Sequence, residues 1–312
     1  MLIQRTALAT ALLAATLPAS VMANTADIYG RLVLTMQANE IAGDSETKIA
    51  SHSSRFGVRG GHEISAGLEA IYQAEFGMGV TSSTSFSNRN QFVGLKGDFG
   101  MTTIGRRDTA LKMSRGSVEQ FLTYDGDLNK TMGGEVRADQ QVSYSTPVIA
   151  DLLRGEVTYL ADDGNGEHGA SMAAMLGDPR YAKQPFYAAV AYDSEVANRN
   201  ILRLTVGGKI AGVEVGAIYS DEEIVNEGDS AGASGASGDA FLVSAGYDLG
   251  QYRIMAQYSD GDVPGKANTT YTLGGEYRLS KQLRVNAYYS GVEFDSRDED
   301  DRYLAAGLRY DF

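Results

Sequence analysis

Residues 202–220 read LRLTVGGKIAGVEVGAIYS, and this stretch decides the fold. Its first half alternates apolar with polar side chains, as in Leu202-Arg203-Leu204. A period of two places the apolar side chains on one face of a β-strand and the polar ones on the other. Ala211 and Gly212 then separate this half from a second alternating segment. The stretch therefore predicts two antiparallel strands joined by a tight turn.

The same alternation recurs from Ile28 to the C-terminus, and it predicts an all-β chain with 16 strands. An even number of strands suits a closed antiparallel barrel. The predicted strands are 28–38, 54–61, 66–77, 89–97, 101–107, 137–146, 153–160, 170–177, 186–193, 202–210, 213–220, 240–249, 252–259, 270–279, 283–290 and 302–312.

The connections between these segments alternate between short and long. Turns as short as 97–100 and 249–251 join some neighbours, whereas long polar segments join others, among them the first to the second strand and the fifth to the sixth. Short turns at one end and long loops at the other are typical of an up-and-down antiparallel barrel. Strands of about 9 to 11 residues also match the length of a tilted bilayer crossing.

The polar face of the strands carries many charges, and these indicate that water fills the inside of the barrel. No protein core buries so many charged groups without partners. A water-filled lumen accommodates them, with the apolar face turned toward lipid, and a closure of 16 strands leaves an aqueous channel. The charged residues on this face include Arg31, Arg55, Arg59, Glu69, Glu75, Arg137, Arg203, Lys209, Glu214 and Arg278.

The N-terminus has the organisation of an export signal. Arg5 supplies a positive charge, residues 6–17 form an apolar stretch, and Val21-Met22-Ala23 is a small-x-small cleavage site. We therefore expect a signal peptide over residues 1–23 and a barrel domain over residues 24–312.

Composition excludes several other classes. The 312 residues contain 27 Lys and Arg against 40 Asp and Glu, a net charge of −13, with no Cys and three His. The acidity argues against nucleic acid as a partner, and the composition excludes disulfides and thiolate metal sites. Most of the acidic excess lies in long polar segments, which we expect to form an acidic outer surface. Divalent cations could bridge this surface to lipopolysaccharide, and we expect no other cofactor. The long polar segments are 40–52, 161–169, 193–199, 221–239, 259–268 and 295–301.

Several segments, in chain order, resemble motifs of the general porins of Gram-negative outer membranes. Together with the export signal they cover the whole mature chain. The segments are IYGRL at 28–32, SRFGVRG at 54–60, RNQFVGLK at 89–96, IGR at 104–106, VSYSTP at 142–147 and the terminal LRYDF at 308–312.

The resemblance implies a homotrimer of 16-stranded barrels in the outer membrane of a Gram-negative bacterium, each a passive diffusion channel for ions and small hydrophilic solutes. It also implies that the third long loop, about 107–136, folds into the lumen and narrows it. Lipopolysaccharide, outer-membrane lipid and the barrel assembly machinery are the other expected partners. Leu308, Tyr310 and Phe312 are similar to the terminal assembly signal of the family.

The resemblance further implies a ladder of basic residues on the wall that faces acidic residues of this loop. By position in the motifs, the ladder comprises Arg31, Arg55, Arg89 and Arg137, with Arg59 and Arg106 as extra candidates.

The alternation along the strands supports three members of this ladder, because Arg31, Arg55 and Arg137 lie on the face opposite to the apolar side chains. On the loop, Asp127 matches one acidic position of the family, but the second position holds Thr131. The alternatives for the second acid are Glu119, Asp125 and Glu135.

Three other functions compete with a general diffusion porin. A channel selective for one solute class, such as anions or sugars, would favour an aromatic track, and none is evident. An outer-membrane hydrolase would need a Ser–His pair on the outer barrel face, which strand phase does not provide. A surface adhesin would need neither a long inward loop nor an arginine ladder. We therefore expect no enzymatic activity.

Overall fold

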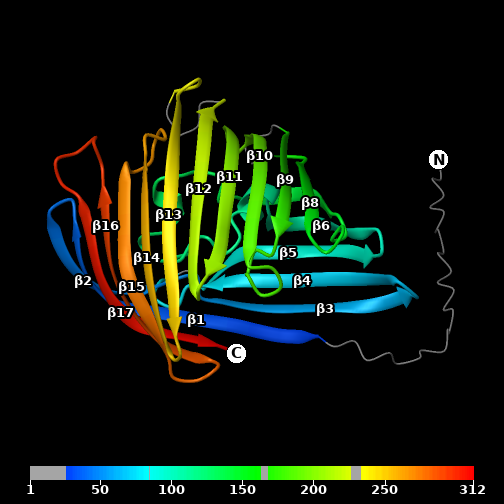
Figure 1. The fold of residues 1–312 in the computed structure, drawn as a ribbon, viewed down its shortest axis with the longest axis horizontal. Coiled ribbons are helices and arrows are strands. Elements are labelled where there is room, and N and C mark those ends of the chain that lie inside the picture. Colours follow the sequence, from blue (N-terminus) through cyan, green and yellow to red (C-terminus); the bar gives the residue numbers. More distant parts are fainter. Residues whose placement is uncertain (1–25, 84, 163–167, 226–232) are drawn as a thin grey trace, which may run out of the picture.

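The computed structural model describes residues 26–83, 85–162, 168–225 and 233–312, and these form one closed antiparallel β-barrel (Figure 1). The predicted signal peptide and its cleavage site lie outside the described residues. Neither of the short helices in the described chain, α1 and η1, has the length and apolar run that a membrane crossing needs. In Figure 1 the strands of the nearer wall cross those of the farther wall steeply, as tilted strands of a barrel do.

The described chain forms seventeen strand segments and two short helices. They are β1 (Asp27–Ile41), β2 (Asp44–Ser51), β3 (Arg55–Ser65), β4 (Leu68–Met78), β5 (Phe86–Gly97), β6 (Gly100–Asp108), α1 (Ala110–Ser114), the 3-10 helix η1 (Leu128–Lys130), β7 (Arg137–Ser145), β8 (Leu153–Leu160), β9 (Gly169–Gly177), β10 (Phe186–Val196), β11 (Arg199–Ile210), β12 (Val213–Ile224), β13 (Ser237–Leu249), β14 (Tyr252–Gly261), β15 (Thr269–Arg278), β16 (Leu283–Glu293) and β17 (Asp301–Asp311).

These segments occupy sixteen positions around the wall, which confirms the predicted barrel. β2 pairs with the upper part of β1, over residues 34–41, and β3 pairs with its lower part, over residues 27–31. The chain leaves the wall between them at residues 52–54. The backbone N–H of Val33 then donates to Ser54 Oγ at 3.0 Å, so a side chain replaces the missing ladder bond.

The prediction of a long loop is wrong for two segments, 40–52 and 193–199. Residues 44–51 of the first form β2, and the second, 193–199, contains only the two-residue turn Ala197-Asn198 between strands. β2 escaped detection because its sequence, DSETKIAS, is mostly exposed and has no apolar period. The expected acidic outer surface is also smaller than predicted, since Asp193 and Glu222 lie buried within β10 and β12.

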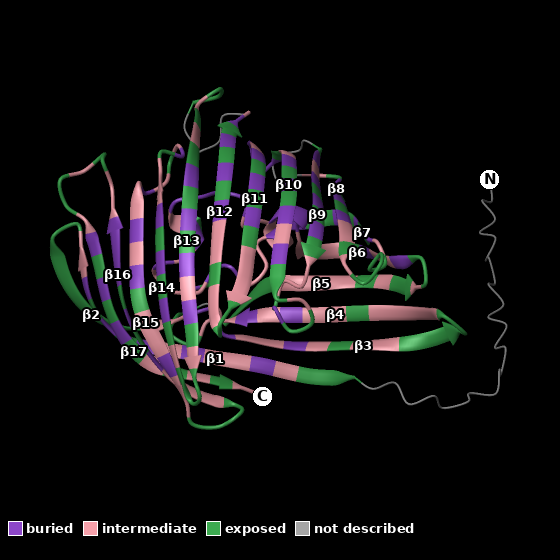
Figure 2. Ribbon diagram, viewed as in Figure 1, coloured by how far each residue is buried: buried purple, intermediate pink, exposed green. Residues whose placement is uncertain are grey.

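The two faces of the wall differ as the alternation predicts. Figure 2 shows buried and exposed residues alternating along β10 to β13. Large apolar side chains such as Met36, Ile104 and Val206 are exposed on the outer face, where lipid covers them in a membrane. The alternating set on the inner face is polar and buried, for example Thr35, Gln37 and Ser143.

The barrel closes between its first and last strands. β1 pairs with β17 from Arg31–Asp311 to Glu40–Arg302. Beyond β17, Gly30 and Phe312 exchange two backbone hydrogen bonds of 2.9 and 3.0 Å. The ring of Phe312 lies so close over Gly30 that a Cβ there would sit 2.2 Å from its Cζ. A side chain at this position would displace the Phe312 ring from the seal of the barrel.

Candidate functional site

The segment between β6 and β7, residues 109–136, is the longest described connection and is called loop 3 here. The predicted start at 107 is two residues early, because β6 continues to Asp108. Thr109 caps α1 by accepting the Lys112 N–H with its side-chain oxygen at 3.4 Å. Asp127 caps η1 in the same way, accepting the Asn129 N–H at 2.9 Å.

Loop 3 packs apolar side chains against the inner face of one side of the barrel. Leu111 belongs to a cluster with residues of β9 to β11, and Val118 belongs to one with residues of β12 and β13. Phe121 packs with Met255, Tyr288 and Ala305 on β14, β16 and β17. Loop 3 therefore follows the inner surface from β9 round to β17.

Small residues on this part of the wall make room for loop 3. A Cβ on Gly216 would lie 2.6 Å from Cγ1 of Val118, and a Cβ on Gly207 would lie 3.0 Å from its Cγ2. Real Cβ atoms essentially never come within 3.0 Å of another heavy atom, and a Cβ on Gly207 would also lie 2.1 Å from the Tyr181 hydroxyl oxygen. The two glycines, on β12 and β11, thus form a recess that only an unsubstituted backbone provides.

Hydrogen bonds anchor loop 3 to the same strands. The Leu111 N–H donates to Ser171 Oγ on β9 at 2.9 Å, and Gln257 on β14 donates to the Gly126 carbonyl at 3.0 Å. Among the described residues, no hydrogen bond joins loop 3 to β3, β4 or β5. We call β9 to β16, with the parts of β17 and β1 that contact loop 3 at Ala305 and Gln37, the covered wall.

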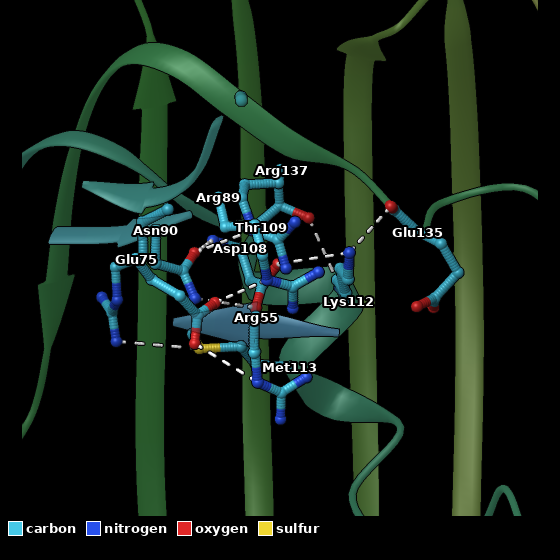
Figure 3. Close-up of polar contacts among 12 residues, drawn as sticks. Arg55, Glu75, Arg89, Asn90, Asp108, Thr109, Lys112, Met113, Glu135 and Arg137 are labelled. Atoms are coloured by element: carbon cyan, nitrogen blue, oxygen red, sulfur yellow. Dashed lines mark hydrogen bonds and ion pairs between the residues drawn. The ribbon is translucent and has the colours of Figure 1, made fainter. Parts of the chain in front are cut away.

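Arg55 and Arg89 lie on the uncovered side, and both contact one carboxylate. Arg55 Nε lies 3.4 Å from Glu75 Oε2, and Arg89 Nε lies 2.7 Å from Glu75 Oε1. Figure 3 shows both guanidinium groups converging on Glu75, which is 5% exposed on β4. Two cations therefore share one anion, which leaves a net positive charge.

Arg31 repeats this arrangement beside them. Its Nε lies 2.5 Å from Asp311 Oδ1, while Arg309 Nε lies 2.9 Å from Asp311 Oδ2. Arg31 is the cross-strand partner of Arg55, so both side chains lie on the same face. We call the set Arg31, Arg55, Arg89 and Arg309, with Glu75 and Asp311, the arginine wall.

Arg137 lies next to this group but pairs elsewhere. Its Nη2 lies 3.0 Å from Asp108 Oδ1, and its Nε donates to Asn90 Oδ1 at 2.9 Å (Figure 3). Lys112 of α1 contacts the same carboxylate of Asp108 at 3.2 Å. Arg137 thus connects the wall to the start of loop 3.

The two extra ladder candidates lie apart from these four arginines. Arg59 is exposed and pairs with Asp27 at 2.7 Å near the beginning of β1. Arg106 pairs with the exposed Asp139 of β7. Neither shares a carboxylate with the arginine wall.

Of two acidic candidates, Glu135 anchors loop 3 to the covered wall and Glu119 is paired within loop 3. Glu135 pairs with Arg115 of loop 3 and with Arg203 of β11, whose Nη1 lies 2.9 Å from its Oε1. Glu119 lies 3.5 Å from the same Arg115 and accepts the Leu128 N–H at 2.8 Å. Burial, followed by the nearby charge of Asp127, raises the pKa of Glu119 to about 8.

The other two acidic candidates are also engaged. Asp125 accepts hydrogen bonds from Gln37 Nε2 and Tyr288 OH, each at 2.6 Å. Asp127 accepts two backbone N–H groups of loop 3 itself. Thr131, at the second acidic position of the family, is buried with its Oγ1 2.5 Å from Ser259 Oγ. Each predicted loop carboxylate is therefore hydrogen-bonded to loop 3 or to the wall.

The sequence analysis missed three residues that these groups require. Arg309 alternates with the apolar Leu308 and Tyr310, so strand phase could have assigned it to the inner face. Arg115 and Glu222 carry no such signal. Glu222 accepts the Gly133 N–H of loop 3 at 2.7 Å, a contact that depends on the path of the loop.

Within the described chain, no three His, Asp or Glu side chains gather as a cluster that could hold a metal ion. The divalent cations expected at the outer loops stay a prediction.

The sequence matches a known protein family along nearly its whole length. A family model described as Gram-negative porin matches residues 9–310. The chain is 25% identical to a major outer membrane protein P.IB of Neisseria gonorrhoeae, over 87% of this chain and 89% of that protein. It is 26% identical to a protein of the same name from Neisseria meningitidis serogroup B, over 97% and 98% of the two chains.

Solved structures share the fold at lower identity. An anion-selective porin from Comamonas acidovorans superimposes with a TM-score of 0.73 at 17% identity, over 93% of this chain and all of that one. The OmpF of Salmonella typhi, solved with daunomycin, gives a TM-score of 0.73 at 16% identity, over 93% and 98% of the chains. With the closed barrel and the match along nearly its whole length, the chain belongs to the Gram-negative porin family.

Proposed function

We propose that loop 3 constricts the lumen and that solutes pass between it and the arginine wall, where they are filtered by size and charge. As a Gram-negative porin, the protein lies in the outer membrane and forms a water-filled channel for passive diffusion, and it is not an enzyme. The observation that carries the proposal is the unequal pairing of charges, with two arginines for each of Glu75 and Asp311.

The charge of the gap favours anions. The arginines of the wall are partly exposed and exceed their carboxylates, whereas the carboxylates of loop 3 are engaged in hydrogen bonds. Fixed charge of one sign in a narrow aqueous passage raises the local concentration of the opposite ion. Screening extends over about 10 Å at 0.1 M salt, so the preference weakens as ionic strength rises. The structural neighbour from Comamonas acidovorans is an anion-selective porin, which agrees with this expectation.

Planar bilayer recordings of the purified protein test the proposal. Under a KCl gradient we expect stepwise currents whose reversal potential is shifted toward the equilibrium potential of chloride. The double variant Arg55→Gln and Arg89→Gln shifts this potential toward cation preference, because it leaves Glu75 uncompensated.

Arg302→Gln is the matched control, since this exposed arginine pairs with Glu40 at the rim of the barrel. It removes one positive charge, as each substitution of the double variant does, and leaves the reversal potential unchanged. Absence of stepwise currents from the unmodified protein would refute the channel itself. A reversal potential that stays constant in the double variant would refute only the filter.

Assembly into a homotrimer is part of the proposal. A solved OmpT of Vibrio cholerae, described as a trimer form, shares the fold with a TM-score of 0.68 at 19% identity.

The ring of Phe312 stacks on that of Tyr310 at the lipid-facing end of β17, where the barrel assembly machinery has access to them. Deletion of Phe312 is expected to lower the amount of assembled barrel in outer-membrane fractions, and a normal yield would argue against this signal.

Lipopolysaccharide and outer-membrane lipid are the proposed surroundings of the trimer. Divalent cations at the acidic outer loops would bridge to anionic lipopolysaccharide. Chelation is then expected to weaken lipopolysaccharide binding by the purified trimer, and unchanged binding would exclude the bridge.

A further inference from the structure

A cavity of about 810 Å³ lies between α1 and the short-turn end of the barrel. Besides α1, its lining comes from the connections 146–152 and 178–185 and from the inner faces of β8 and β9. Its volume falls within the range of roughly 300 to 1,000 Å³ that small-molecule sites occupy. In barrels of this kind the short-turn end faces the periplasm, so the cavity opens to that side.

Backbone contacts hold the two sides of the cavity together. The Ser117 N–H of loop 3 donates to the Pro179 carbonyl at 3.0 Å, and the Tyr187 hydroxyl donates to the Ser114 carbonyl at 2.8 Å. Gly116 has a φ of +59°, and a Cβ there would lie 3.2 Å from Pro179 Cβ. The cavity is therefore formed before any ligand binds.

The charges around the cavity are unequal. Five cations and three acids line it; Lys112 and Arg115 are paired with carboxylates, and two of the acids are already satisfied. Asp108 pairs with Arg137 and Lys112, and Asp178 accepts three backbone N–H groups of its own turn. The cations are Lys112, Arg115, Arg154, Arg180 and Lys183, and the third acid is Asp151.

Arg154 is the cation best placed to receive an anion. It lies half-buried on β8, and its Nη2 contacts the sulfur of Met175 at 3.3 Å. Among the described residues, no carboxylate pairs with Arg154, Arg180 or Lys183. A partly desolvated guanidinium with free N–H groups favours a carboxylate, which it can bind through two parallel hydrogen bonds.

Apolar side chains line the same cavity, and the sulfur of the buried Met175 contacts the Arg154 guanidinium. Met113 of α1, Leu152 and Met175 line the cavity together with Arg154. Methionines in particular adapt to aromatic rings and contact them favourably. A simple inorganic anion would leave this apolar surface exposed to water.

We propose that this cavity binds a small aromatic carboxylate from the periplasmic side, with its carboxylate on Arg154 and its ring against Met113 and Leu152. The exposed Lys183 and Arg180 attract the anion at the entrance. The site uses none of the four arginines of the arginine wall, so it does not depend on the proposed filter. It adds a retained ligand to a channel that otherwise only lets solutes pass.

Calorimetric titration of the detergent-solubilised protein with benzoate tests the site. We expect Arg154→Gln to weaken benzoate binding by about tenfold or more, the scale of one charged hydrogen bond. Lys183→Gln, a change at an exposed position, weakens it by a smaller factor. Arg59→Gln, which removes an exposed arginine outside the cavity, leaves it unchanged. Acetate and benzyl alcohol, which lack the ring and the charge respectively, bind more weakly than benzoate.

Equal weakening by Arg59→Gln would overturn the proposal, because it would show attraction to overall charge. Acetate or benzyl alcohol binding as tightly as benzoate would also overturn it. Unchanged affinity in both Arg154→Gln and Lys183→Gln would do the same. Heat-modified migration on gels confirms that each variant is a folded barrel before titration.

Discussion

The covered wall and the arginine wall of the same barrel use charged residues in opposite ways. Arg203 on the covered wall is fully buried, and it contacts Glu135 and the Gly133 carbonyl of loop 3. Arg89 on the arginine wall keeps part of its guanidinium accessible and shares Glu75 with a second arginine. Both lie on inner faces of strands.

The difference shows that loop 3, and not the strand pattern, decides what an inward charge does. Where the loop covers the wall, a charge becomes a structural anchor, because desolvation makes every lost partner costly. Where the wall is uncovered, water screens the charge and leaves it available to solutes. Four predictions test this contrast.

The largest expected effect is on the covered wall, from Arg203→Leu. This substitution removes one of the two cations of Glu135, which keeps Arg115, removes a charge that interacts with the buried Glu222, and leaves the Gly133 carbonyl without its donor. Breaking a buried pair in this way costs about 3–5 kcal/mol. Urea unfolding followed by far-ultraviolet circular dichroism measures it. Arg302→Leu at the rim serves as the control, and an equal midpoint for both variants would remove the contrast.

Gly216→Ala is expected to be the next in size. The new Cβ lies 2.6 Å from Val118 Cγ1, and overpacking of this kind costs about 1–3 kcal/mol. We also expect noisier single-channel currents, because loop 3 is pushed from its recess. Val118→Ala in the same chain restores both properties if the recess is the cause. A double variant that behaves like Gly216→Ala alone would show that the clash lies elsewhere.

We expect the free energy of unfolding to depend on pH through Glu119 of loop 3, which packs on the covered wall. Burial raises the pKa of its carboxyl from 4.5 to about 8. The folded protein therefore holds a proton that the unfolded chain releases, and stability falls as pH rises through that window, by at most about 1.4 kcal/mol per pH unit. Unfolding midpoints across the window measure the slope.

Glu119→Gln is expected to flatten this slope, because the amide does not titrate. Glu46→Gln, at an exposed position of β2, keeps the slope of the unmodified protein. If Glu119→Gln retained the full slope, the titrating group would be a different one.

The smallest effect on stability is expected at the arginine wall. Arg89→Gln leaves Glu75 paired with Arg55, so the free energy of unfolding changes by less than about 1 kcal/mol. The same urea series measures it. A loss as large as that of Arg203→Leu would mean that the arginine wall is a structural anchor as well.

Much of the fold could be predicted from the sequence, because a barrel repeats one local rule. Alternation such as Leu202-Arg203-Leu204 fixes strand and face together, and it placed each of the sixteen wall positions. It missed β2, since a strand exposed on both sides has no apolar period. The rule depends on one buried face and fails without it.

The candidate site was predictable only where it depends on strand phase. Arg31, Arg55 and Arg89 lie together because β1, β3, β4 and β5 follow one another in the wall. The partners of Glu119 and Glu135 depend on the path of loop 3, which is set by recesses such as Gly216 on distant strands. No local period encodes such contacts.

The seal between β1 and β17 has a consequence for how the barrel forms. Arg31 and Asp311 are separated by nearly the whole chain, so their pairing requires the costliest ring closure in the molecule. Contacts of such long range form late and slow folding. Until Phe312 docks over Gly30, two strand edges stay unpaired, and in lipid each unpaired N–H or C=O costs several kcal/mol. A chain that lacks residues 309–312 therefore loses the lower part of this seam, where Arg31 pairs with Asp311 and Gly30 with Phe312.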